Sequence, residues 1–497
     1  MMDVKPERNS VPRGAQWAGW PLRALVVAAL AAGPAAGHVW AQVPNPGSAQ
    51  NPFYGSVTVQ MAGGDALHLS LDQAIQMGLQ NNLGLKEAEN NEKILKGEKN
   101  QALQEFLPTI ALDGDTGVYQ HDLAAQGFNS GVVAGFGSLF PGGQLPAGVS
   151  FITKDDLTQG MLTFKQTLFS GPVIAGWKAA GAAERVAYYA KESARGEVVQ
   201  QVASAYLHAV AAASEVDNAT AQLAADKVAL QHAHDAHMAG TASNLDELRA
   251  RVQFQAQQQA LIAVQNAHEK DLILLKREIG IDPGRDIVLT DAAPYSDLTE
   301  QTPAKVRALA YRSRQDYQNL QNQVAELRAV HSAYRAQRLP TLKFSGFWGV
   351  DTVNGAGTHG NFAAVGTLSI PIFREAGLRG NEDASKAQLE SAEAQLEDLR
   401  NHIDEQVRDA LLDVAANQKL VAVARSNVDL ATQALSDETD RVNAGVDDNL
   451  PLVTAQARLA AAENNLVESL YQCNLSKLAL ARAAGVLETQ YRDYIGH

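Results

Sequence analysis

The residues best suited to chemistry in this chain are three histidines, and their spacing favours neither catalysis nor a metal site. His232, His234 and His237 fall within one predicted helix, where separations of two and three residues do not put all three on one face. His234 and His237 can be neighbours, but no third ligand is evident, so we expect solvated histidines. The chain also lacks a Gly-x-Ser-x-Gly elbow, a Gly-x-x-x-x-Gly-Lys phosphate loop and a His-Glu-x-x-His motif. We therefore predict a protein that is not an enzyme and uses no cofactor.

Most of the chain repeats one unit, so the elements that carry these residues occur twice. Residues 106–110, Phe-Leu-Pro-Thr-Ile, recur as Arg-Leu-Pro-Thr-Leu at 338–342. Residues 238–245, Met-Ala-Gly-Thr-Ala-Ser-Asn-Leu, recur as Asn-Ala-Gly-Val-Asp-Asp-Asn-Leu at 443–450. An internal repeat of this kind marks a duplicated structural unit. A low aromatic content of 6% favours long helices over a compact sandwich.

Each predicted unit has an opening helix, a two-stranded hairpin, a very long helix and a return helix. In the first unit, Ser70 is a suitable N-cap, Pro108 ends the opening helix near Phe106, and period-two alternation predicts a strand at 109–119. The other predicted elements are an exposed loop at 120–158, strands at 162–168, 342–350 and 365–373, long helices at 175–238 and 378–442, and return helices at 246–279 and 452–484.

The ends of the chain and the join between the repeats complete the predicted organisation. Basic residues, an apolar run at 24–32 and small residues before position 41 indicate a cleavable signal peptide. The run is shorter than the roughly 20 residues of a membrane-spanning helix, which argues against a membrane anchor. The only cysteine, Cys473, is far from the cleavage point, so no lipid anchor is expected. The predicted segments are a signal peptide (1–41), an extended arm (42–68), the first repeat (69–280), a linker (281–302), the second repeat (303–486) and a C-terminal tail (487–497).

The four predicted strands each have one apolar and one polar face. Asp113, Asp115, Lys165 and Lys343 fall on the polar face, and Trp348 falls on the other. A four-stranded sheet leaves two edges open, and an open edge in a membrane costs several kcal/mol for each unpaired backbone group. We therefore expect copies of the chain to close a shared barrel as a cyclic homo-oligomer. In a wide barrel the polar face lines water, which makes these four charged residues candidates for the barrel lumen.

With these elements in place, the chain resembles the TolC-type outer membrane efflux proteins. The resemblance covers about 69–486 and rests on the duplicated unit with its Leu-Pro-Thr motif, on the paired Ala-Gly turns followed by Asn-Leu, and on the opening helix from Leu69 to Asn82. It implies a mainly α fold, in which long antiparallel helical hairpins form an α-barrel in a trimer. Four strands from each chain would contribute to one twelve-stranded β-barrel in the outer membrane.

The resemblance also implies a function and a set of partners. The function is a passive exit duct from the periplasm to the exterior for drugs, toxic compounds or metal ions. The implied partners are two further copies of the chain, a periplasmic adaptor (membrane fusion) protein, an inner-membrane pump of the RND, MFS or ABC type, and outer membrane lipid. A net charge of −14 without a basic stripe excludes a sequence-independent nucleic-acid binder.

In that family the helix tips dock the adaptor and close the periplasmic entrance. The resemblance places Gly240, Asn244, Gly445 and Asn449 at the docking tips. The pore-constriction candidates are Asp246, at the place of a family aspartate, together with Glu247, Asp447 and Asp448. A threefold ring of carboxylates would favour cations. The alternative for each acid is a solvated residue at a helix N-terminus.

The second tip departs from the family pattern. Pro451 stands at the place that matches Asp246, and Val442 and Asp447 occupy the places of a tyrosine and an arginine. The second tip of this chain therefore lacks these residues of the gate network of better-known members. Two other functions stay open. One is the exit duct of a type I protein secretion system, which shares the fold. The other is a periplasmic coiled-coil scaffold, which explains the helices but not the four amphipathic strands.

Overall fold

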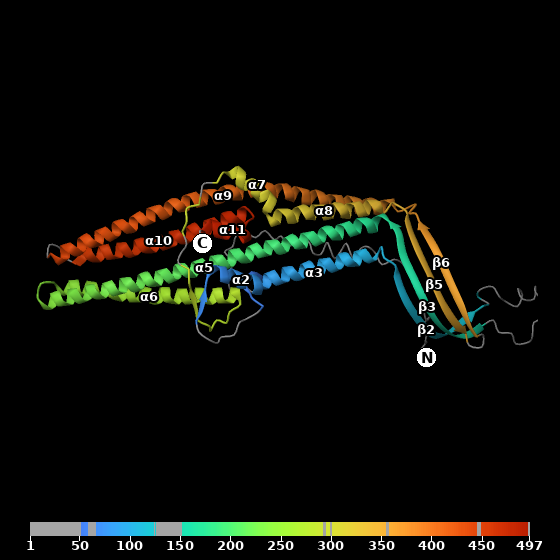
Figure 1. The fold of residues 1–497 in the computed structure, drawn as a ribbon, viewed down its shortest axis with the longest axis horizontal. Helices are drawn as coiled ribbons and strands as arrows, with labels where there is room; N and C mark the ends of the chain where they lie inside the picture. The colour runs from blue at the N-terminus through green and yellow to red at the C-terminus, as the bar shows by residue number, and fades with distance from the viewer. Residues whose placement is uncertain are drawn as a thin grey trace, which may run out of the picture. The chain divides into compact units, whose positions relative to one another are not determined.

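Long helices and one four-stranded sheet make up most of the part of the chain that the structure describes (Figure 1). The computed structural model describes residues 51–57, 66–123, 125, 152–291, 295–298, 301–353, 357–444 and 449–495. All of these belong to one packing unit, Pro46–His497. The predicted signal peptide at 1–41 lies outside the described residues, as do Gly445, Asp447 and Asp448.

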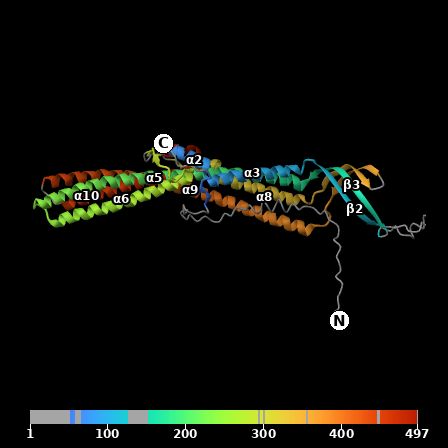
Figure 2. The ribbon, with the colours of Figure 1, turned by 90° about the horizontal axis from the view of Figure 1, so that it is seen from below.

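The helices follow the predicted repeat closely. Each half has an opening helical segment, a long helix and a return helix that folds back along it (Figures 1 and 2). The first half contains α2 (Leu71–Asn81), α3 (Leu83–Gln104), α5 (Gly171–Met238) and α6 (Asn244–Ile279). The second contains α7 (Pro303–Ser313), α8 (Gln315–Ala336), α9 (Glu375–Asn443), α10 (Asn449–Ala483) and α11 (Leu487–Ile495). Within the described ranges, none of the helices is long and apolar enough to cross a bilayer.

The opening helix of the first repeat is broken, which differs from the single predicted helix that ends near Phe106. It starts as expected, because Ser70 caps α2 in a reciprocal capping box with Gln73. It then breaks at Asn82, whose extended backbone separates α2 from α3. The Asn82 side chain accepts a hydrogen bond from the Leu85 amide (3.3 Å) and donates one to the Phe53 carbonyl (2.6 Å). The break therefore depends on a partner that is distant in sequence.

The second repeat breaks at the matching place, between α7 and α8. Arg314 has extended backbone there, and its guanidinium contacts Asp316 (2.6 Å) and Gln406 (2.6 Å). The two opening segments thus share one design, in which a buried polar residue turns the chain between two helices. The Gln406 side chain belongs to α9, so this break too is fixed by a contact far along the chain.

The four strands form one antiparallel sheet in the order β2-β3-β5-β6. The strands are β2 (Thr109–Asp122), β3 (Ile152–Ser170), β5 (Thr341–Val353) and β6 (Gly357–Ser369). β2 continues into the start of the predicted loop at 120–158 and β3 begins before its end, so the loop between the strands is shorter than expected. β3 carries an irregularity between Thr167 and Phe169, where its register against β5 shifts. β2 and β6 form the two edges of the sheet in this chain.

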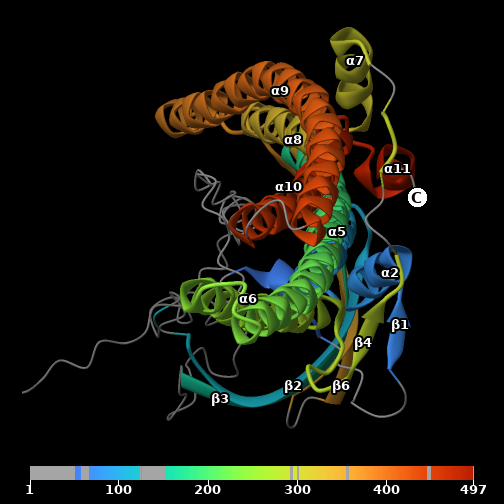
Figure 3. The same cartoon turned by 90° about the vertical axis from the view of Figure 1, so that its left-hand side faces the viewer.

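The hydrophobic core lies around the middle of α5. Val198, Val202 and Tyr206 of α5 are almost completely buried. Gly78 of α2 permits close contact, because a Cβ atom there would lie 2.7 Å from the Val202 side chain. Figure 3 shows α2, α7 and α11 on one side of the long helices. The core therefore forms where the short helices α2 and α11 pack against α5.

Three segments without predicted secondary structure contribute to that region. β1 (Leu67–Leu69), in the predicted arm and at the start of the first repeat, pairs in parallel with β4 (Ile287–Leu289), in the predicted linker. The predicted C-terminal tail forms α11, whose Tyr491, Tyr494 and Ile495 are buried in the core. These segments pack against the middle of the helices, which is why they are ordered although their own sequences are short.

Candidate functional site at the tip of the first hairpin

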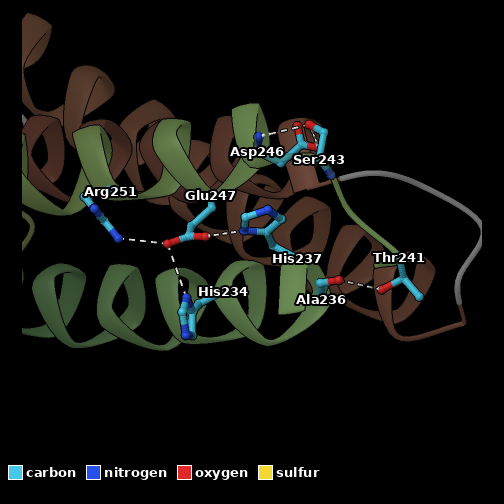
Figure 4. Close-up of polar contacts among 8 residues, drawn as sticks. All are labelled: His234, Ala236, His237, Thr241, Ser243, Asp246, Glu247 and Arg251. Atoms are coloured by element: carbon cyan, nitrogen blue, oxygen red, sulfur yellow. Dashed lines mark hydrogen bonds and ion pairs between the residues drawn. The ribbon is translucent and has the colours of Figure 1, made fainter. Parts of the chain in front are cut away.

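The turn between α5 and α6 brings two helix ends together at one end of the molecule's helical part (Figure 1), and Figure 4 shows its polar contacts. α5 ends at Met238, and Gly240 follows with φ of 72°, the left-handed conformation that favours glycine after the end of a helix. The Thr241 amide and hydroxyl both donate to the Ala236 carbonyl, at 2.9 and 3.0 Å. These bonds satisfy a carbonyl at the end of α5 and fix the direction in which α6 leaves the turn.

Asp246 caps the start of α6. The Asp246 amide donates to Ser243 Oγ (3.3 Å), and Asp246 Oδ2 accepts from the Ser243 amide (3.2 Å) and hydroxyl (2.7 Å). Arg249 also contacts the carboxylate at 3.3 Å. The hydrogen bonds from Ser243 hold the pKa of the Asp246 carboxyl below its usual range. The Asp246 side chain is thus engaged within the turn of its own subunit.

Glu247 lies between the two helices instead of facing solvent. The residue is 7% exposed, and its carboxylate contacts His237 Nδ1 (2.6 Å) and His234 Nδ1 (3.2 Å) from α5. Arg251, one turn further along α6, donates to the same carboxylate at 2.8 Å. Hydrogen bonds from His237 and His234 lower the pKa of the Glu247 carboxyl. We call these four residues, His234, His237, Glu247 and Arg251, the tip cluster (Figure 4).

The structure places the other predicted tip residues at the surface or outside the described ranges. Gly240 and Asn244 are exposed at the first turn, as an adaptor-docking position requires. Asn449 begins α10. Gly445, Asp447 and Asp448 lie outside the described residues, so the second turn is known only from its sequence. In the described part of the chain, no group of three or more histidine, cysteine, aspartate or glutamate side chains has the geometry of a metal site.

The sheet register puts the four predicted lumen residues on one face. Asp113 pairs with Met161 and accepts a hydrogen bond from Thr163 (3.1 Å), and Asp115 accepts one from Gln159 (2.6 Å). Lys165 lies opposite Thr109 and Ser345 on that face, and Lys343 lies opposite Thr167. Every second residue along a strand points to the same face of the sheet, and residues paired across neighbouring strands share a face. The side chains of Asp113, Asp115, Lys165 and Lys343 therefore all point to the same side.

The opposite face of the sheet is apolar and exposed. Leu112 is 80% exposed, Phe362 78% and Trp348 65%. Leu112 pairs with Leu162, Leu162 with Trp348 and Trp348 with Phe362, so the register sets these side chains in one row across all four strands. An apolar surface of this kind marks an interaction with a membrane or with other protein.

Sequence reasoning missed Arg251 and the role of the histidine pair. The three-residue separation of His234 and His237 correctly suggested that they could be neighbours. The acceptor they share, Glu247, comes from the next helix, across the turn. The signal was present in the sequence, because a hairpin folded at Gly240 brings α5 residues before the turn close to α6 residues after it.

The family model for outer membrane efflux proteins matches residues 74–280 and 306–486, one match for each repeat. The chain belongs to the outer membrane efflux protein family. Among solved structures, the outer membrane protein VceC of Vibrio cholerae is similar, with a TM-score of 0.67, 19% identity, and coverage of 84% of this chain and 96% of that chain. The Campylobacter jejuni CmeC outer membrane channel has a TM-score of 0.70, 13% identity, and coverage of 88% and 92%. No curated protein matches the chain.

A third similar structure is the open state of the Neisseria gonorrhoeae MtrE outer membrane channel, with a TM-score of 0.68, 17% identity, and coverage of 84% of this chain and 89% of that chain. At these identities the structures establish a common fold. The family match establishes an efflux channel of the outer membrane, and it confirms the prediction that the protein is not an enzyme, because members of this family are channels.

Proposed function

We propose that three copies of the chain form one passive exit duct, which carries small molecules from the periplasm to the exterior as part of a tripartite efflux system. The observation that carries the proposal is the pair of open sheet edges. β2 and β6 are 14 and 13 residues long, and neither has a second strand partner among the described residues. Because four antiparallel strands place β2 and β6 in opposite directions, β6 of one copy can pair antiparallel with β2 of the next, and head-to-tail pairing closes a ring.

The two faces of the sheet fit such a barrel. The row of Leu112, Leu162, Trp348 and Phe362 would contact lipid, while the face with Asp113 and the other lumen candidates would line water. A single chain in water would leave this apolar row exposed, which is a large unfavourable surface. Insertion in the outer membrane removes it from water.

The helices also present surfaces that suit neighbouring copies. α9 carries an exposed apolar stripe of Leu412, Leu420, Val423 and Leu430, at helical spacing. α6 carries another, with Leu245, Leu248, Val252, Ile262 and Ile273. These helices belong to different hairpins of the chain, so the α9 stripe of one copy facing the α6 stripe of the next would close a ring of helices.

The assembly can be tested by introducing a charge into the α9 stripe. Val423→Glu should shift the detergent-extracted protein from three copies toward one, measured by native mass spectrometry. Ala422→Glu is the matched control, because Ala422 is exposed on the same helix and lies about 100° around it from Val423, outside the stripe. Helical content in each variant, from circular dichroism, separates loss of assembly from loss of folding. A wild-type protein that is a folded monomer after mild extraction would refute the proposed trimer.

The proposed partners would engage the duct at the turns that end its two helical hairpins. A periplasmic adaptor would dock at the tips, at Gly240 and Asn244 of the first turn and Gly445 and Asn449 of the second, and an inner-membrane pump of the RND, MFS or ABC type would supply the energy. We further propose export through cleavage of the signal peptide at 1–41, without a lipid anchor.

A cation-favouring entrance is part of the proposal. Asp246 and Glu247 are engaged within the first hairpin, so Asp447 and Asp448 would contribute most of the charge at the aperture. The double variant Asp447→Ala, Asp448→Ala should reduce the cation preference of single channels in a lipid bilayer, measured as the reversal potential in a salt gradient. An unchanged reversal potential would contradict the carboxylate ring and leave the duct itself unaffected.

A further inference from the structure

The tip cluster joins α5 to α6 through one carboxylate and three donors. Glu247 accepts from His237 at 2.6 Å and from His234 at 3.2 Å, both through Nδ1, and from Arg251 at 2.8 Å. Two of these three bonds cross from one helix to the other. They lie directly before and after the turn that joins the two helices (Figure 4).

The cluster occurs in only one of the two repeats. In the register that pairs Gly240 with Gly445, the places of His234 and His237 hold Thr439 and Val442. The places of Glu247 and Arg251 hold Leu452 and Gln456. The second hairpin therefore lacks both imidazoles and the carboxylate. A feature needed only to close a helical hairpin would be expected in both copies, so the cluster gives the first tip a property that the second does not have.

That property is a response to protons. Histidine is the side chain whose ordinary pKa lies between pH 5 and 8. A neutral imidazole with its proton on Nδ1 already donates a hydrogen bond to a carboxylate, and a protonated imidazole adds the attraction between its positive charge and the carboxylate. Glu247 remains ionised through this range, because its hydrogen bonds to His237 and His234 lower the pKa of its carboxyl. Mild acidification therefore strengthens both cross-helix hydrogen bonds at pH values where the Glu247 carboxylate is still ionised.

Among the described residues, no other charged group competes for Glu247. On α5, Asp235 accepts from Gln231 (2.9 Å). On α6, Arg249 contacts Asp246. α10, which packs against α5, begins at Asn449 and carries no acidic or basic residue before Arg458. The charge of the tip cluster therefore depends on the Glu247 carboxylate, Arg251 and the two imidazoles.

We propose that the tip cluster is a proton-sensitive latch, which holds the α5–α6 tip more tightly in mildly acidic surroundings than in mildly alkaline ones. Loosening at alkaline pH would be confined to the first tip, since the second repeat has no equivalent residues. The cluster lies within one hairpin, so its behaviour does not depend on the number of copies in the assembly or on the cargo. In the proposed duct, each subunit would then contribute one hairpin whose tip responds to pH and one whose tip does not.

Hydrogen exchange of the purified wild-type protein tests the latch. Amide exchange rates at the tip, residues 231–251, are measured at about pH 5.5 and about pH 8 and divided by the intrinsic rate at each pH. The corrected exchange at the tip should be slower at the lower pH by roughly fivefold for each imidazole that gains charge. Amides around Val202, in the core of α5, provide the internal reference and should show no such change.

Three variants separate the latch from general effects of pH. The double variant His234→Gln, His237→Gln should abolish the pH dependence at the tip, and Glu247→Gln should abolish it and speed exchange at both pH values. His232→Gln is the matched control, because His232 is exposed on the same helix and makes no described contact with Glu247, so the pH dependence should persist. If the corrected exchange at the tip is the same at both pH values in the wild type, or if the double variant retains the wild-type dependence, the latch is refuted.

Discussion

Replacing Glu278 with glutamine should remove a penalty on stability that grows with pH. Glu278 of α6 is completely buried, and its Oε1 accepts a hydrogen bond from Gln201 (2.9 Å). Its Oε2 is buried without a partner among the described residues. Burial, opposed only in part by the Gln201 bond and by Arg277, raises the pKa of the carboxyl from 4.5 to about 8. The side chain is therefore neutral in the folded protein at neutral pH, although it would be ionised in the unfolded chain.

The size and sign of the effect follow from that difference in pKa. A rise from 4.5 to about 8 corresponds to at most about 5 kcal/mol of unfolding free energy. Because the folded pKa is raised, this contribution is fully present below pH 4.5 and is lost progressively as the pH rises to about 8. Glutamine keeps the carbonyl that accepts from Gln201 and has no proton to lose, so Glu278→Gln should not show this decline.

The measurement is thermal unfolding in detergent, followed by circular dichroism, for wild type and variant at a series of pH values between about 5 and 9. The wild-type curve should fall relative to the Glu278→Gln curve as the pH rises. Glu269→Gln is the control, because it makes the same substitution at an exposed position of the same helix. Parallel wild-type and Glu278→Gln curves across this range would show that the buried carboxyl is not neutral, and would refute the reasoning.

Two further predictions concern single side chains in the core and at turns. Gly485→Ala should destabilise the protein more than Gly240→Ala: both have positive φ, which costs a non-glycine residue about 1–2 kcal/mol, but only at Gly485 would a new Cβ meet backbone, 2.6 Å from the Arg314 nitrogen. Chemical denaturation compares the two, and equal losses would contradict the predicted clash. Tyr206→Phe should cost about 1.5–3 kcal/mol, because the buried hydroxyl donates to an Asp291 carboxylate oxygen at 3.0 Å. An unchanged denaturation midpoint would show that this bond adds nothing to stability.

Local patterns in the sequence were sufficient where the cause of a structure is also local. Ser70 caps α2 through Gln73, three residues away, and Gly240 takes the left-handed conformation that the end of a helix favours. The alternation around Asp113 correctly predicted which residues of β2 share a face, because residue spacing alone decides which side of a strand a residue occupies. The repeat then transferred the same interpretation to the second half of the chain.

The sequence was insufficient where the partner lies far along the chain. The break at Asn82 depends on the Phe53 carbonyl, and β1 pairs with a strand beyond the far end of the first repeat, at Ile287–Leu289. In the candidate site, Asp246 and Glu247 were predicted as pore-constriction candidates, with solvated acids at a helix N-terminus as the alternative. Whether such an acid faces solvent or the adjacent helix depends on how the hairpin packs, and Glu247 is buried because His234 and His237 reach it from α5.

The unbroken course of α5 and α9 has a mechanical consequence. α5 is 68 residues long, which corresponds to a rod of roughly 100 Å, and α9 is similar at 69 residues. The companions of each rod change along its length, from α3 to α6 beside α5 and from α8 to α10 beside α9. At the changeover the rods contribute to the hydrophobic core together with the short helices α2, α7 and α11, and we call this region the collar. A lateral force on a tip would therefore be absorbed at this collar, so the entrance could bend while the strands at the far end keep their shape.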